Sequence, residues 1–218
     1  MTDIVRPEPP TRAHRAPAGE GERLRTQLLD VTERLLSERG SMDAVSLRQV
    51  AGEVGVTATS IYLHFADKED LFIAVCHRRF EDLAAVLHHA RSGSAAPVEQ
   101  LQACIRAYVD FGLAHPVAYK VLFGTLPKSM ISQRVPEDEL IGLQIINEMA
   151  QIVQQGIEDG VFREVDPFAC TVGLWAVSHG LVGAMDHSED FPQLTVDGLV
   201  EVTVDMMLDG LRPRTGYG

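Results

Sequence analysis

Apolar side chains recur three and four positions apart over most of this chain, which is the spacing of amphipathic α-helices. In the first such stretch, 23–39, Leu24, Leu28 and Leu35 share one face and Gly40 follows as a stop. The other long helices are expected over 67–91, 97–115, 137–159, 167–185 and 194–211, with a loop over 124–136. No segment alternates apolar and polar residues between turn signals, so no strand is expected. The pattern predicts an all-α fold of about nine or ten helices.

A shorter pattern over 46–72 predicts two small helices joined by a tight turn. Ser46 is a good N-cap and Gln49 completes a capping box with it. Gly55 stands where a left-handed residue ends the first helix, and Thr57 can cap the second. This arrangement is typical of a helix-turn-helix, and it predicts a unit that binds DNA.

The charge of the chain is uneven. Its net charge is −12, but residues 1–80 hold 11 basic and 12 acidic residues whereas residues 81–218 hold 8 and 19. The less acidic first part agrees with contact to nucleic acid by that end. Residues 1–19 are rich in proline, glycine and charge, which predicts a disordered arm. Arg12 and Arg15 of this arm either enter the minor groove of DNA or are simply disordered, and disorder is the favoured reading.

Several classes of protein receive no support from the sequence. No run of about 18 consecutive apolar residues predicts a membrane span, and the N-terminus has no apolar segment of a secretory signal. Cys76, Cys104 and Cys170 form no CxxC pair and are interpreted as reduced core thiols of a cytoplasmic protein. The chain contains no GxSxG, HExxH, Walker A or strand-linked GxGxxG pattern, so no enzyme, cofactor or metal site is expected.

The residues from Ser46 to Leu71 resemble the TetR family of bacterial transcriptional regulators. The resemblance rests on residues in one register around and after the turn: Ser46, Val50, Ala51, Gly55, Val56, Thr57, Ile61, Tyr62, His64, Phe65, Lys68 and Leu71. Where the family often has lysine-glycine, this chain has Ala58-Thr59, which removes a charge from the recognition helix. The segments 115–123 and 175–184, the latter with Trp175, His179 and Gly180, resemble a subgroup with a WHG-type C-terminal domain.

The resemblance implies roles for residues at matching positions. Phosphate contacts are expected from Ser46, Thr57, Tyr62, His64 and Lys68, and contacts in the major groove from Arg48, Ala58, Thr59, Ser60 and Leu63. Packing is the alternative reading for Tyr62 and the preferred one for Phe65, and His64 is as readily a surface histidine.

The resemblance also implies a small, largely apolar effector in the C-terminal part. Its candidate contacts are Tyr108, Phe111, His115, Tyr119, Phe123, Met149 and Trp175, although core packing is the default reading of the aromatic and apolar ones. His179 is expected to satisfy a backbone or interface hydrogen bond rather than to bind ligand.

The sequence therefore predicts a disordered arm (1–19), a helix-turn-helix domain (20–66) and a helical effector-binding and dimerisation domain (67–218). A homodimer joined by the last two helices, bound to a near-palindromic operator, is expected because one short recognition helix reads few base pairs. The expected function is a repressor that its effector releases from DNA. A constitutive DNA-binding regulator without ligand is the alternative, and a helical enzyme is a remote one.

Overall fold

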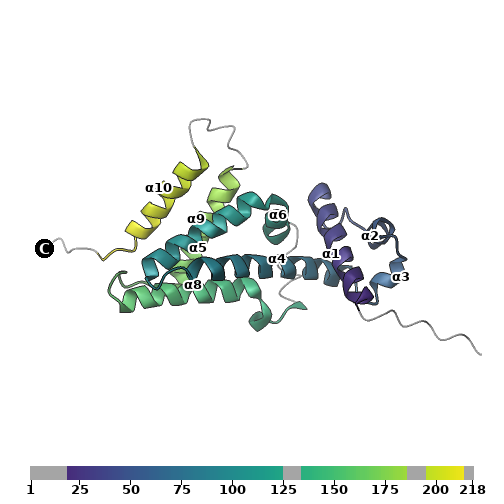
Figure 1. Ribbon diagram of the computed structural model, residues 1–218, viewed down its shortest axis with the longest axis horizontal. Helices are drawn as coiled ribbons and strands as arrows, with labels where there is room; N and C mark the ends of the chain where they lie inside the picture. Colours follow the sequence, from purple (N-terminus) through teal and green to yellow (C-terminus); the bar gives the residue numbers. More distant parts are fainter. Residues whose placement is uncertain (1–18, 125–133, 186–194, 214–218) are drawn as a thin grey trace, which may run out of the picture.

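The computed structural model describes residues 19–124, 134–185 and 195–213, and these residues form helices and connecting turns without a strand. Figure 1 shows a small group of helices at one end and a larger bundle at the other, bridged by one long helix. The elements in chain order are α1 (Glu20–Arg39), α2 (Leu47–Val54), α3 (Ala58–Ile61), α4 (Lys68–Arg91), α5 (Pro97–Ala114), α6 (Pro116–Gly124), the 3-10 helix η1 (Glu137–Glu139), α8 (Ile141–Glu158), α9 (Pro167–Met185) and α10 (Val196–Asp209). The all-α prediction is confirmed.

Local capping determines where the short helices begin and end. The backbone N–H of Gln49 donates to Ser46 Oγ at 3.3 Å and the N–H of Ser46 donates to Gln49 Oε1 at 2.9 Å, so the predicted capping box is present. Gly55 ends α2 with a φ of 82°, a backbone conformation that favours glycine. Thr57 Oγ1 accepts from the N–H of Ser60 at 3.3 Å and so caps α3. The polypeptide therefore turns sharply between α2 and α3, as the sequence predicts.

The long helix α4 belongs to both halves of the molecule (Figure 1). Its first half supplies Leu71, Phe72 and Val75 to a core shared with α1 and α2. Its second half supplies Leu83 and Leu87 to the larger core of the C-terminal helices. The N-terminal core thus extends beyond residue 66, where the sequence places the end of the first domain. The division into three segments stays a prediction.

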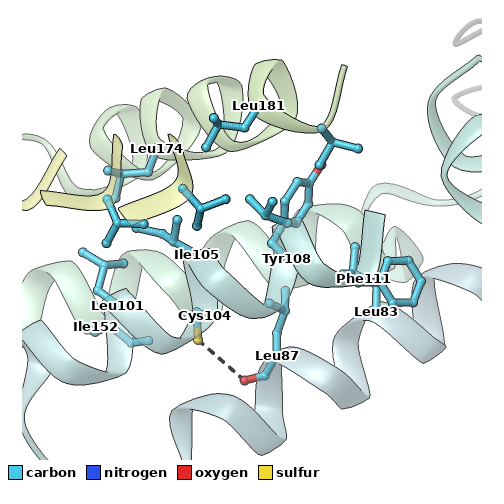
Figure 2. Close-up of a cluster of buried hydrophobic side chains, with 14 of the residues drawn as sticks. Leu83, Leu87, Leu101, Cys104, Ile105, Tyr108, Phe111, Ile152, Leu174 and Leu181 are labelled. Atoms are coloured by element: carbon cyan, nitrogen blue, oxygen red, sulfur yellow. Dashed lines mark hydrogen bonds between the residues drawn. The ribbon is translucent and has the colours of Figure 1, made fainter. Parts of the chain in front are cut away.

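Helix α5 lies at the centre of the larger core. Figure 2 shows Leu101, Ile105 and Tyr108 of α5 between Leu87 on one side and Leu174 and Leu181 on the other. The Cys104 thiol donates to the backbone oxygen of Leu87 at 3.6 Å, which fits a core thiol. The three cysteines are free.

The region before α8 differs from the sequence prediction of one helix from residue 137. Residues 137–139 form a separate 3-10 turn, and Leu140 is extended, with φ −74° and ψ 98°, before α8 begins at Ile141. The acidic run is therefore not the first turn of α8. Leu140 lines an apolar cavity against α4, and this tertiary packing outweighs the local helix propensity of the acidic residues. Most of the predicted 124–136 loop, and the arm with Arg12 and Arg15, lie outside the described residues.

Candidate nucleic-acid interface and effector region

The end of the molecule that carries α2 and α3 presents polar and apolar side chains to solvent. Tyr62 is 56% exposed and Leu63 is 82% exposed, although both follow a helix whose Ile61 is fully buried. Ser46, Arg48, Thr57 and Thr59 are also exposed, whereas Ala58, Ser60, His64 and Lys68 are half-buried. All ten predicted DNA contacts thus retain accessible surface, on α2 and α3 with the residues that cap them, on the turn after α3, and on the first residue of α4.

Two of the three predicted hydroxyl contacts to phosphate, Ser46 and Thr57, are already engaged within the fold. Ser46 Oγ lies 3.0 Å from Gln49 Oε1 in addition to capping α2, and Thr57 Oγ1 lies 2.9 Å from Ser60 Oγ. A phosphate oxygen would therefore compete with these partners for the hydroxyl protons. The large exposed fraction of Tyr62 argues against packing as the role of its ring.

Phe65 packs as the sequence analysis prefers, since it is 3% exposed. The guanidinium of Arg25 in α1 lies 5.3 Å from the centre of its ring. Arg25 is a cation beside the recognition surface, and the sequence indicated it only as one of several arginines near the start of the less acidic part. The signal that could have identified it was its place at the start of an amphipathic helix packed on the helix-turn-helix. Lys68 lies at the first position of α4, with Nζ 5.5 Å from the ring centre of Phe72.

Four of the predicted effector contacts come together between α5, α6 and α9. The rings of Tyr119 and Phe123 lie 4.9 Å apart, and those of Phe123 and Trp175 lie 6.2 Å apart. Trp175 Nε1 donates to Tyr108 Oη at 3.1 Å. His179 stacks on Tyr119 at 5.2 Å, and its Nδ1 is hydrogen-bonded to Tyr119 Oη. These residues form one aromatic cluster whose polar atoms are hydrogen-bonded to one another. His179, which was expected only to satisfy a hydrogen bond, belongs to this cluster.

Burial governs the titration of this aromatic cluster. Burial lowers the pKa of His179, so its neutral ring is favoured in the folded chain. Burial also raises the pKa of Tyr108 and of Tyr119, which keeps both hydroxyls protonated at neutral pH. The cluster is therefore uncharged, and it suits a ligand that brings no net charge.

Of the three remaining predicted effector contacts, Met149 lies beside the aromatic cluster, whereas Phe111 and His115 pair with each other. Met149 of α8 lines, together with Tyr108 and Trp175, an apolar cavity of about 40 Å³. Phe111 and His115 instead pair with each other, with ring centres 5.1 Å apart. The cavity beside the aromatic cluster has room for only a few water molecules, whereas ligand pockets typically measure about 300–1,000 Å³.

A second apolar cavity of about 200 Å³ lies between α4 and the residues that lead into α8. Its walls are formed by Ile73, Cys76, His77, Phe80, Val135, Glu139, Leu140, Ile141, Gly142 and Leu143. Of these residues only Phe80 could be expected from the sequence, as an aromatic residue of the core or of a cavity; the others were missed because the 3-10 turn that brings them against α4 was predicted as regular helix. Ile73, Cys76 and Phe80 share one face of α4, which is the only signal the sequence holds.

The described residues contain no group of three or more histidine, cysteine or acidic side chains that is placed to hold a metal ion. Burial raises the pKa of the Cys76 thiol to about 12 and that of Cys104 to about 11, so both stay protonated and are poor nucleophiles at neutral pH.

Comparison with known proteins agrees with this geometry. Residues 28–75 match the family described as "Bacterial regulatory proteins, tetR family", and residues 101–211 match the family described as "Tetracyclin repressor-like, C-terminal domain". The HTH-type transcriptional repressor KstR2 of Mycobacterium tuberculosis is 29% identical over 147 residues, which cover 67% of this chain and 72% of that protein. The HTH-type transcriptional activator FasR of Mycolicibacterium smegmatis is 28% identical over 120 residues, covering 51% of this chain and 54% of that protein.

Solved structures share the fold. A protein of unknown function from Rhodococcus sp. RHA1 superimposes with a TM-score of 0.72 at 25% identity, over 87% of this chain and 96% of that one. The structure of the ketosteroid transcriptional regulator KstR2 of Mycobacterium tuberculosis gives a TM-score of 0.62 at 21% identity, over 87% and 95% of the two chains. The helix-turn-helix, the helical C-terminal domain and the family matches over both parts lead to one conclusion: this chain belongs to the TetR family of bacterial transcriptional regulators.

Proposed function

We propose that the chain is a homodimeric repressor that binds a near-palindromic operator and leaves it when a small, largely apolar effector binds. The observation that carries DNA binding is the exposure of Tyr62 and Leu63 beside a capped α3, on a helix-turn-helix held by its own core. Thr59 and Arg48 are proposed to read base edges, whereas Lys68 is proposed to contact phosphate.

Dimerisation is proposed through α9 and α10. Of the apolar residues on which the sequence prediction rests, Leu174, Leu181, Val182, Val204 and Leu208 are buried within the chain's own core. Exposed apolar side chains nevertheless remain on the two helices, namely Phe168, Val172 and Val177 on α9 and Val202 and Met206 on α10. A two-fold contact would bury them against the same residues of a second copy.

By length and composition alone, helix α9 is also apolar enough to cross a membrane. Of its most apolar stretch of 18 residues, 28% is buried inside the chain. The buried face of α9 packs in the core shared with α5 and α8. Its open face, which carries the exposed Phe168, Val172 and Val177, is the one proposed to contact a second copy of the chain. TetR-family regulators are soluble DNA-binding proteins. We therefore propose that this chain is cytoplasmic and that the open face of α9 contacts protein, not lipid.

The apolar effector is supported by the apolar cavity of about 200 Å³ and by the name of a relative, the ketosteroid regulator KstR2. Repression is proposed from the similarity to KstR2, although FasR is named an activator. The test begins with duplexes selected from a random pool by the full chain. Fluorescence anisotropy then measures their affinity with and without a panel of steroid ketones, fatty acids and aromatic hydrocarbons. A fall in affinity with one compound class supports the proposal, and tight binding that no compound alters supports the constitutive regulator.

A further inference from the structure

The side chain of Arg134 connects the segment before α8 to the first turn of α4. Its Nη1 donates to both carboxylate oxygens of Asp67, at 3.0 and 2.9 Å, and its Nη2 pairs with Glu69. Asp67 caps α4 by accepting from the N–H of Asp70 at 2.9 Å, and this bond together with Arg134 holds the pKa of the Asp67 carboxyl below its usual range. One guanidinium thus compensates two carboxylates that flank Lys68.

The lining of the apolar cavity of about 200 Å³ begins one residue after Arg134. Val135, the residue after Arg134, and Ile73 of α4 both line it. Farther along, the ring of Phe80 packs on Gly142, where a Cβ would lie 3.1 Å from Phe80 Cε1. Because the two walls pack closely there, a molecule larger than the cavity would have to move the 135–143 wall away from α4. Such a movement would displace Arg134 as well, since it precedes Val135 in the chain.

We propose that this cavity takes a small, neutral, apolar molecule of two or three aromatic rings, and that its binding withdraws Arg134 from Asp67 and Glu69. The inference rests on the proposed function, in which the Lys68 end of α4 faces DNA and an apolar effector weakens binding. It places the ligand away from the contact residues expected around Tyr119, which adjoin a cavity of only about 40 Å³.

The sign of the effect follows from charge. With Arg134 in place, the carboxylates of Asp67 and Glu69 are compensated beside the phosphate-facing Lys68. When the guanidinium leaves, two negative charges remain next to the DNA backbone and repel it. The ion pair is partly exposed and contributes little to folding, so its consequence is for DNA affinity rather than for stability.

The first experiment changes charge alone. Arg134→Ala in the full chain is expected to weaken binding to a selected duplex about three- to tenfold in roughly 0.1 M salt, and less as salt rises. Adding Glu69→Gln to Arg134→Ala should restore much of the affinity, because it removes one of the uncompensated carboxylates. Asp67 is left unchanged, since it caps α4. A purely structural role for Arg134 predicts no such recovery. Unchanged binding by Arg134→Ala, or no recovery in the double variant, overturns the proposal.

The second experiment locates the ligand with the neutral dye N-phenyl-1-naphthylamine, followed by its fluorescence. Ile73→Phe, which fills this cavity, should weaken dye binding at least fivefold, whereas Met149→Phe, which fills the smaller cavity, should leave it unchanged. In the wild-type protein, dye and DNA should weaken each other's binding by the same factor. Arg134→Ala should abolish that coupling while leaving dye binding intact. If Met149→Phe weakens dye binding and Ile73→Phe leaves it unchanged, the proposal is overturned.

The two proposals fail in different ways. If a compound from the panel releases DNA equally from wild type, Ile73→Phe and Arg134→Ala, the ligand-released repressor stands and the role of this cavity is wrong. If the wild-type chain enriches no duplex from a random pool, the proposed function itself fails.

Discussion

Replacing Lys68 by alanine should flatten the salt dependence of DNA binding by a calculable amount. The ammonium group lies on the first residue of α4, beside the exposed turn that holds Tyr62 and Leu63, where a phosphate contact is proposed. Each phosphate contact contributes about 0.9 to the slope of log K against log salt. A dimer loses two contacts, so the slope should fall by about 1.8. Between 50 and 200 mM salt the variant should lose about tenfold less affinity than the wild-type protein.

The assay is fluorescence anisotropy on one selected and one random duplex at four or five salt concentrations. Arg212→Ala provides the matched control, because it removes an exposed cation at the opposite end of the molecule, beyond α10. Its slope should equal that of the wild-type protein. Lys68→Ala should weaken both duplexes equally, since phosphate contacts carry no sequence information. An unchanged slope for Lys68→Ala, or a loss confined to the selected duplex, would refute the phosphate role.

Three further predictions concern stability and assembly. Ser46→Ala removes the α2 cap and should lower the free energy of unfolding by about 1 kcal/mol in urea melts, with a larger loss pointing to a role beyond the cap. Met206→Glu together with Val202→Glu should turn the dimer into a monomer in light scattering, and an unchanged dimer would place the interface elsewhere. Burial lowers the pKa of His179 in the folded chain below the value of about 6.5 expected in the unfolded chain. The neutral ring therefore stabilises the fold above about pH 6.5, and this stability is lost as the pH falls through the folded-state pKa. His179→Gln should therefore lose less stability than wild type between pH 7.5 and 5.5 in urea melts, and equal losses would exclude that residue as the cause.

Local signals made the N-terminal part predictable. The Ser46–Gln49 capping box, the Gly55 stop and the Thr57 cap act between residues at most four apart, so the sequence contains all the information needed. The same holds for Asp67 as the cap of α4 and for Pro97 at the start of α5.

Long-range packing limited what could be predicted in the C-terminal part. The acidic residues before α8 favour a helix locally, but the structure has a 3-10 turn there and Leu140 faces α4 across an apolar cavity. The gathering of Tyr119 and His179, 60 positions apart, depends on how α6 packs beside α9. The contact of Arg134 with Asp67 spans 67 positions, and no local pattern indicates it.

Periodicity alone also could not separate the two apolar faces of the last helices. Val204 and Leu208 are buried in the chain's own core, whereas Val202 and Met206 are exposed, and all four belong to one amphipathic helix. The residues available to a second copy became apparent only when the core of one chain was in place.

The central claim is that a two-fold dimer reads DNA through the α2–α3 unit, and site selection from a random duplex pool tests it most directly. The predicted result is enrichment of two inverted half-sites whose centres lie about one helical turn, roughly 10 base pairs, or a multiple of it apart. Thr59→Ala should change the preferred base within both half-sites and leave their spacing unchanged. Enrichment of a single unpaired site, or no enrichment at all, would contradict the account.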